Sequence, residues 1–100
     1  MTLLLRKINA RMNVPEQIKH KLHSFFNISE LILIDDSHKH KNHKKDTSGG
    51  HFKLLIVSDD FINVPLIKRH RLIYEALKEM IKIDIHALSI KAETIEEYNN

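Results

Sequence analysis

FKLLIV, at residues 52–57, is followed by a linker at 58–64 and by a helical pattern that begins near Pro65 and runs to about Lys82. The short apolar, β-branched run predicts a strand. Helical spacing of apolar residues after it predicts an amphipathic helix. Another apolar run, from Ile83 or Ile85 to Ile90, predicts a further strand. Two strands joined through a helix form a right-handed crossover, and they are parallel if they share a sheet.

The predicted helix at 65–82 has a regular apolar stripe. Its members are Leu66, Ile67, His70, Ile73, Tyr74, Leu77, Met80 and Ile81. The last strand is followed by Thr94-Ile95-Glu96-Glu97-Tyr98, in which Thr94 is a good helix cap and the two glutamates favour a helix N-terminus. A final helical turn is therefore expected.

The residues before FKLLIV predict one more helix and one more strand. Pro15 suits the first turn of a helix whose apolar stripe includes Ile18 and Leu22, with His20 and His23 exposed. Residues 31–34 read Leu-Ile-Leu-Ile, which predicts a buried strand ended by two aspartates. Residues 37–50 are polar and close with two glycines, so they form a loop.

The whole pattern is α-β-β-α-β-α. A chain of 100 residues supports one domain, so the sequence predicts a small α+β domain with a three-stranded mixed sheet and helices on one face. We assign residues 1–14 to an N-terminal extension and 15–98 to the domain. The 37–50 loop joins the end of the first strand to the start of the second. A third strand parallel to the second begins at that same end of the sheet. The loop histidines and His86 should therefore lie near one another.

The composition limits the chemistry. The chain has no cysteine, so any metal must be held by histidine, by carboxylates or by ligands of a partner. The formal net charge of +3 is modest for a nucleic-acid binder. Leu3-Leu4-Leu5 is too short to span a bilayer. We expect a cytoplasmic protein, with the mitochondrial matrix as the weaker alternative because residues 1–13 carry basic and no acidic side chains.

Histidines are the first candidate site, because neutral imidazole binds iron, zinc, copper and nickel. The candidates are His38, His40, His43, His51 and His86. His38 and His43 are better explained as solvated loop residues, and His51 as a residue that caps the loop by hydrogen bonding. His86 alternates with Leu88 and Ile90, so it is expected on the same face as two core residues and could be purely structural.

A basic cluster is the second candidate. Lys68, Arg69, His70 and Arg71 lie at the start of the predicted helix, where guanidinium groups could bind phosphate or carboxylate. His70 falls on the apolar stripe and could simply pack. Catalysis has little support, because the adjacent carboxylates at 35–36 and 59–60 point to opposite faces of a strand end.

Several motifs together resemble the BolA family of small proteins, over roughly residues 16–98. They are Ser37-His38-Lys39-His40, His51-Phe52-Lys53, Val57-Ser58, Phe61, Arg69-His70-Arg71 and Ile85-His86-Ala87-Leu88-Ser89. The resemblance implies a fold similar to class II KH domains. It also implies a non-enzymatic partner of a monothiol glutaredoxin that shares a [2Fe–2S] cluster, for cluster trafficking, assembly or iron sensing.

In this reading His86 is one cluster ligand. The second comes from the loop, where the chain resembles the histidine branch of the family: His40 matches best, with His51 and His43 as alternatives. The partner would add its thiolate and a bound glutathione. The resemblance also implies that Arg69, His70 and Arg71 face a partner. Alone, the chain is expected to be a monomer or a weak homodimer.

Two other functions remain open. Some bacterial BolA-like proteins are described as transcription regulators, so Lys68, Arg69 and Arg71 could bind DNA. RNA binding of the KH kind lacks its Gly-x-x-Gly loop, because the only glycines are adjacent, at 49 and 50. The histidine-rich loop could instead buffer divalent metal ions.

Overall fold

The computed structural model describes residues 12–37 and 50–100. The elements in this part of the chain are α2 (Val14–Phe25), β1 (Glu30–Asp35), β2 (Gly50–Val57), a short 3-10 helix η2 (Asp59–Phe61), α3 (Leu66–Ala76), β3 (Ile85–Glu93) and α4 (Ile95–Asn99). The predicted order of helices and strands is confirmed. No helix among the described residues is both long enough and apolar enough to cross a membrane.

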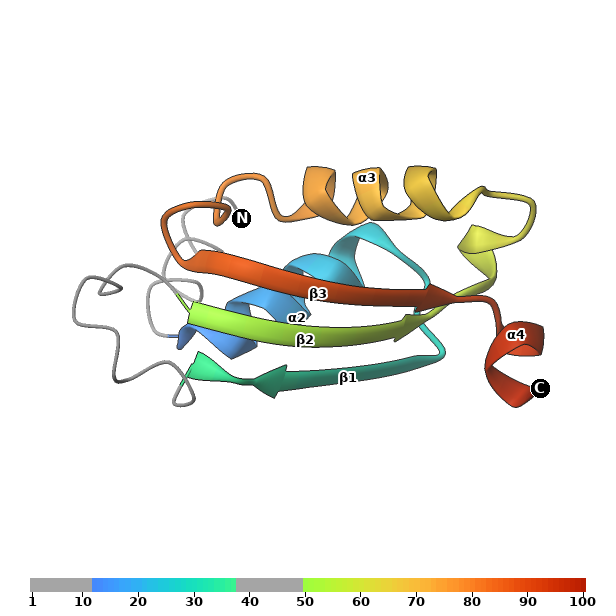
Figure 1. Cartoon of the computed structure of the whole chain (residues 1–100), viewed down its shortest axis with the longest axis horizontal. Helices are drawn as coiled ribbons and strands as arrows, with labels where there is room; N and C mark the ends of the chain where they lie inside the picture. Colours follow the sequence, from blue (N-terminus) through green and yellow to red (C-terminus); the bar gives the residue numbers. More distant parts are fainter. Residues whose placement is uncertain (1–11, 38–49) are drawn as a thin grey trace.

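The sheet is mixed, in the order β1-β2-β3. β1 and β2 are antiparallel and pair from Glu30 opposite Val57 to Asp35 opposite Phe52. β2 and β3 are parallel, as the crossover predicts. Figure 1 shows α2 lying behind the sheet, α3 running alongside β3, and α4 beyond the end of β3.

The core lies between this sheet and α2 and α3. Its buried side chains include Ile18 and Leu22 from α2, Ile73 from α3, and Leu54 and Ile56 from the central strand. α2 begins where its sequence predicts. The Asn13 side chain accepts a hydrogen bond from the backbone N–H of Glu16, and Pro15 occupies the first turn, where its missing N–H has no cost.

The prediction that β1 is a buried strand is wrong. β1 is an edge strand, and its residues alternate between the core and solvent. Leu31 and Leu33 pack against the core, whereas Ile32 and Ile34 are 42% and 51% exposed. Among the neighbouring predictions, His23 is exposed as expected, but His20 is half-buried.

The predicted helix at 65–82 is too long, because α3 ends at Ala76. The chain then turns tightly: the backbone N–H groups of Asp84 and Ile85 both donate to the carbonyl of Met80, and Lys82 has a positive φ of 76°. This turn brings Ile85 into β3 within a few residues. A continued helix would carry the chain away from the sheet.

The predicted apolar stripe of α3 is also partly wrong. Ile73 and Leu77 are fully buried, but Leu66 and Ile67 are each 64% exposed and Tyr74 is also exposed. Arg69, in the first turn of α3, is buried and faces the core. The inward side therefore follows the spacing of Arg69, Ile73 and Leu77, and the two apolar residues before Arg69 are turned to solvent.

Candidate functional site

A β-bulge at the start of β3 sets the direction of His86. The register passes from Gly50 opposite Ile85 directly to His51 opposite Ala87, so His86 is an extra residue on β3. Ile85 is buried, but His86 and Ala87 are both exposed. The expectation that His86 shares a face with the core residues of β3 is therefore wrong, because strict alternation fails at the bulge.

The bulge brings His86 close to His51. The two imidazole ring centres are 5.0 Å apart, with an angle of 44° between the ring planes. His51 is half-buried at the start of β2, and His86 is exposed. The sequence predicted that the loop end of the sheet lies near His86, and His51, which follows the loop, does lie next to it. His38, His40 and His43 lie outside the described residues.

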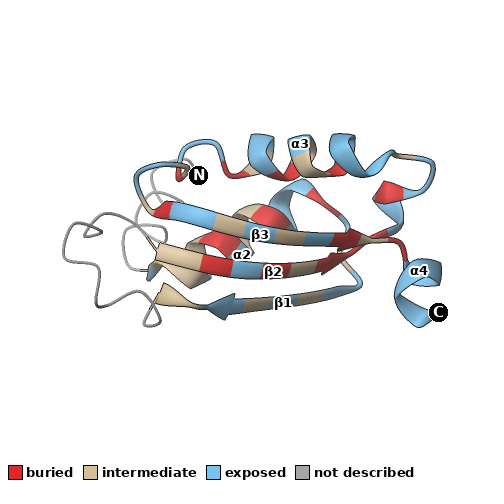
Figure 2. Cartoon of the chain, viewed as in Figure 1, coloured by how far each residue is buried: buried red, intermediate tan, exposed pale blue. Residues whose placement is uncertain are grey.

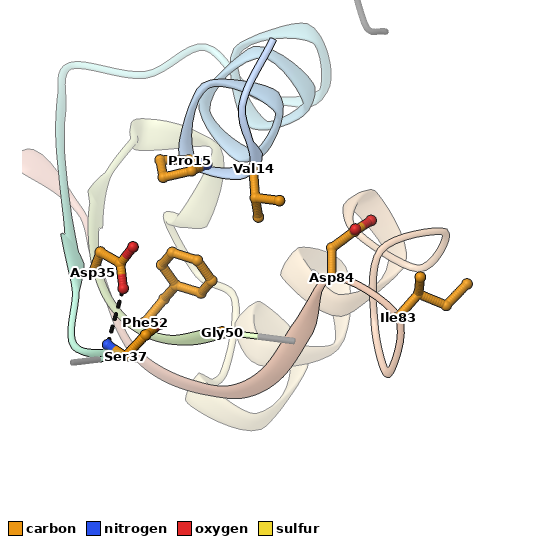
Figure 3. Close-up of a pocket in the computed structure, with 8 residues that line it drawn as sticks. All are labelled: Val14, Pro15, Asp35, Ser37, Gly50, Phe52, Ile83 and Asp84. Carbon is orange, nitrogen blue, oxygen red and sulfur yellow. Dashed lines mark hydrogen bonds between the residues drawn. The ribbon is translucent and has the colours of Figure 1, made fainter. Parts of the chain in front are cut away.

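Ser37 holds the backbone of His51 in place. Its Oγ accepts a hydrogen bond from the His51 backbone N–H at 2.9 Å, and the backbone N–H of Ser37 donates to Asp35 Oδ1 at the same distance. The His51 carbonyl accepts from the backbone N–H of Asp36 at 2.7 Å. Figure 3 shows the Asp35–Ser37 bond between two of the residues that line a pocket.

This role of Ser37 was not predicted from the sequence. The signal was present, because aspartate and serine directly after a strand commonly bind nearby backbone N–H groups.

Gly50 is closely packed where β2 begins. A Cβ atom on this residue would lie 2.7 Å from the Phe52 ring and 2.9 Å from Ser37 Oγ. Its backbone N–H donates to the carbonyl of Asp84, which lies just before β3. Figure 3 shows Gly50 in the pocket with Phe52 and Asp84. The small residue thus permits the close packing that joins the two histidine-bearing strand ends.

The separation of the two imidazole rings is compatible with a shared metal atom. Two imidazoles that bind one tetrahedral metal through nitrogens at about 2.0–2.1 Å have ring centres roughly 5 Å apart. The separation of His51 and His86 matches this value. Within residues 12–37 and 50–100, no group of three histidine or carboxylate side chains could hold a metal ion. A metal on this pair would therefore need ligands from elsewhere.

Arg69 does not face a partner, which corrects the sequence-based prediction. It is 6% exposed, and its guanidinium bonds internal groups. Nε donates to the Val64 carbonyl at 2.7 Å, and Nη1 donates to the Ala92 carbonyl at 3.0 Å and to Glu97 Oε1 at 2.6 Å. Arg69 thereby joins α3 to β3 and to α4. The Phe61 ring lies beneath it, 5.8 Å from Cζ.

Glu97 completes this junction and was not predicted as the partner of Arg69. The hydrogen bond from Arg69 and that from the Thr94 backbone N–H lower the pKa of Glu97 to about 2. Thr94 Oγ1 in turn accepts from the backbone N–H of Glu97, which makes a capping box at the start of α4. The expected Thr94 cap is confirmed.

The other basic residues of α3 remain at the surface. Lys68 and Arg71 are exposed, and His70 is half-buried. His70 lines a hollow of about 530 Å³ with Leu66 and Ile90. The Arg-His-Arg motif is thus divided between one structural arginine, one packed histidine and one exposed arginine.

Comparison with known proteins agrees with this description. The family model described as BolA-like protein matches residues 18–97. The DNA-binding transcriptional regulator BolA of Escherichia coli (strain K12) is 36% identical over 87 residues, which cover 87% of this chain and 81% of that protein. SufE-like protein 1, chloroplastic/mitochondrial, of Arabidopsis thaliana is 41% identical over 87 residues, covering 81% of this chain but only 24% of that protein.

The fold agrees as well. The solved structure of BolA1 from Arabidopsis thaliana has a TM-score of 0.74 and 36% identity, and the match covers 86% of this chain and 96% of that one. Sequence and structure point to the same group of proteins over nearly the whole described domain. The chain belongs to the BolA-like family.

Proposed function

We propose that this protein is a non-enzymatic partner of a monothiol glutaredoxin, with which it shares a [2Fe–2S] cluster in cluster trafficking, assembly or iron sensing. The observation that carries the proposal is the pair of imidazoles at 5.0 Å, formed by the bulge of β3 and the start of β2. The pair can fill only part of a metal coordination sphere. A partner thiolate and glutathione would supply the rest.

His86 is the first ligand in this proposal, and the second is His51 or a loop histidine, His40 or His43. His51 is supported by its position, since Ser37 fixes its backbone next to His86. Imidazole in place of thiolate on one iron raises the reduction potential of a [2Fe–2S] cluster and makes metal binding dependent on pH. That property suits transfer or sensing.

The test is a titration of this protein into a cluster-loaded monothiol glutaredoxin with glutathione, followed by visible absorption and circular dichroism. We expect a new spectrum that saturates at one-to-one stoichiometry and is lost in His86→Ala. His23→Ala is the matched control, because His23 is an exposed histidine on α2. If the titration leaves the spectrum of the glutaredoxin unchanged although both proteins are folded, the shared cluster is disproved.

His51→Ala in the same titration identifies the second ligand. Loss of the new spectrum assigns the ligand to His51. A retained spectrum directs the search to His40→Ala and His43→Ala.

DNA binding is the second candidate. It is favoured by the relative in Escherichia coli that is named a DNA-binding transcriptional regulator and by the exposed cations Lys68 and Arg71 on α3. Arg69 is not included, because its guanidinium is bound internally. Fluorescence anisotropy should show DNA affinity that falls with salt and drops in the double variant Lys68→Ala/Arg71→Ala, but not in His86→Ala. Equal affinity of the double variant and wild type would reject this role for α3.

A further inference from the structure

One face of the sheet is left uncovered by the described helices. We call it the open face, and its side chains are Ile32, Ile34, His51, Lys53, Leu55, Ala87, Ser89 and Lys91. The strand register makes them neighbours: Ile32 lies opposite Leu55, and Leu55 lies opposite Lys91. Figure 2 shows exposed segments along all three strands, with α2 behind the sheet.

The open face is apolar at one side and shallowly hollowed. Ile32 and Ile34 are neighbours on β1, and each is about half exposed. Two adjoining hollows, of about 220 and 270 Å³, share Lys53 and Ser89 along their common border. Exposed apolar side chains that adjoin in this way are typical of a surface that contacts another protein.

The charges of the open face have one sign over its centre. Lys53 and Lys91 lie on neighbouring strands. The carboxylates on this face lie toward the ends of the sheet: Glu30 of β1 and Glu93 of β3 at one end, and Asp36, directly after β1 and next to His51, at the other. Asp36 Oδ2 is 4.0 Å from Lys53 Nζ. The centre of the open face therefore offers Lys91 and the partly paired Lys53 to carboxylates of a partner, beside the apolar Ile32 and Ile34.

The candidate metal ligands belong to the same surface. His51 and Lys53 are on the same face of β2, and the bulge turns His86 and Ala87 outward beside them. A protein that supplies the remaining ligands to the histidine pair must approach from this side. Lys68 and Arg71 lie on α3, which packs on the opposite face of the sheet.

The geometry points to the open face as the docking surface for the monothiol glutaredoxin, an inference that rests on the function proposed above. Ile32 and Ile34 make the apolar contact, and Lys53 and Lys91 pair with carboxylates of the partner or its glutathione.

The test compares reversed charges on two surfaces. Lys53→Glu/Lys91→Glu changes the open face, and Lys68→Glu/Arg71→Glu makes the same charge change on α3. Affinity for a recombinant monothiol glutaredoxin with glutathione is measured by isothermal titration calorimetry without the cluster, and cluster sharing is measured by circular dichroism. Unchanged thermal unfolding establishes that each variant is folded. Ile34→Ser is a further variant that leaves every charge in place.

We expect the open-face double variant to bind about 10-fold or more weakly, the α3 variant to stay within about 2-fold of wild type, and Ile34→Ser to weaken binding. His86→Ala should lose the shared cluster but keep its affinity for the cluster-free partner. Weaker binding only in the α3 variant would overturn the docking surface and leave cluster sharing intact. Failure of wild type to bind the glutaredoxin with or without cluster would overturn both.

Discussion

Arg69 has a different role in the structure from the one that the sequence suggests. In the sequence it belongs to a basic motif, and in the structure its guanidinium bonds the Val64 and Ala92 carbonyls and Glu97. These groups come from three separate segments of the chain. An arginine suits the position because its planar fork can bind several acceptors at once, which a lysine cannot do.

We therefore expect Arg69→Lys to lower the free energy of unfolding by about 2 kcal/mol, because buried acceptors lose their donors while half-exposed Glu97 is partly solvated by water. Arg71→Lys, on the exposed side of the same helix, should stay within about 0.5 kcal/mol of wild type. Urea unfolding followed by circular dichroism measures both. Equal stability of the two variants would show that Arg69 has no special structural role.

Glu97 predicts a pH dependence of stability. Its pKa is lowered to about 2 in the folded protein from 4.5, chiefly by the hydrogen bond from Arg69. A carboxylate with a lowered folded-state pKa contributes stability that is present above its unfolded pKa and is lost as the pH falls toward the folded value. The contribution should therefore disappear between about pH 4.5 and pH 2.

The measurement is the melting temperature of wild type and Glu97→Gln across this pH range. We expect Glu97→Gln to melt lower than wild type at pH 7, with the difference closing as the pH approaches 2. Glu96→Gln serves as the control, because Glu96 is exposed and adjacent but does not contact Arg69. A difference that persists undiminished at pH 2 would contradict the pairing.

At the scale of elements, the ends of α3 and β3 place the candidate site. α3 ends at Ala76, and the following turn depends on a left-handed residue, Lys82, whose N–H donates to the Ile85 carbonyl. The bulge then turns His86 outward. Neither feature has a strong sequence signal, since left-handed positions usually carry glycine or asparagine and this one carries lysine.

Lys82→Gly should therefore stabilise the protein by about 0.5–1 kcal/mol, because glycine adopts a positive φ without the steric cost of a Cβ atom. Lys19→Gly, at an exposed position inside α2, should instead destabilise it by about 1 kcal/mol. If Lys82 is left-handed, urea unfolding should show that the free energy of unfolding rises in Lys82→Gly and falls in Lys19→Gly. Destabilisation by both would refute the left-handed conformation of Lys82.

At the scale of the whole molecule, the strand order makes β2 the most protected element. β2 is bonded on both sides, whereas β1 and β3 are the edges of the described sheet. Because the Asp36 N–H bonds the His51 carbonyl, the alternating ladder directs the amides of Ile32 and Ile34 toward β2 and those of Leu31 and Leu33 toward the outer edge.

Amide hydrogen exchange by NMR should therefore be slowest in β2 and should alternate along β1, with Leu31 and Leu33 exchanging at least 10-fold faster than Ile32 and Ile34. Repeating the measurement at several protein concentrations is the control for self-association. The contrary result is that the amides of Leu31 and Leu33 are as protected from exchange as those of their neighbours, with protection that rises with protein concentration. That result would show that β1 pairs with a second molecule.

Much of the architecture followed from local signals. The apolar runs, the helical spacing, Pro15 and Thr94 predicted the order of elements, and the crossover rule predicted the mixed sheet. Connectivity alone also placed His86 near the start of β2, where it lies next to His51. These features depend on residues close in the chain or on chain handedness, so a single sequence contains them.

Only the tertiary structure decided which way the side chains point and which of them are used internally. The bulge that exposes His86 arises from pairing between strands more than thirty residues apart, and Arg69 is buried because α3, β3 and α4 meet around it. Both outcomes depend on long-range contacts, which the local hydrophobic periodicity of a sequence does not indicate. The sequence by itself therefore determined the order of the elements and the nearness of His86 to the start of β2, and the packing of those elements decided the direction of His86, its contact with His51 and the burial of Arg69.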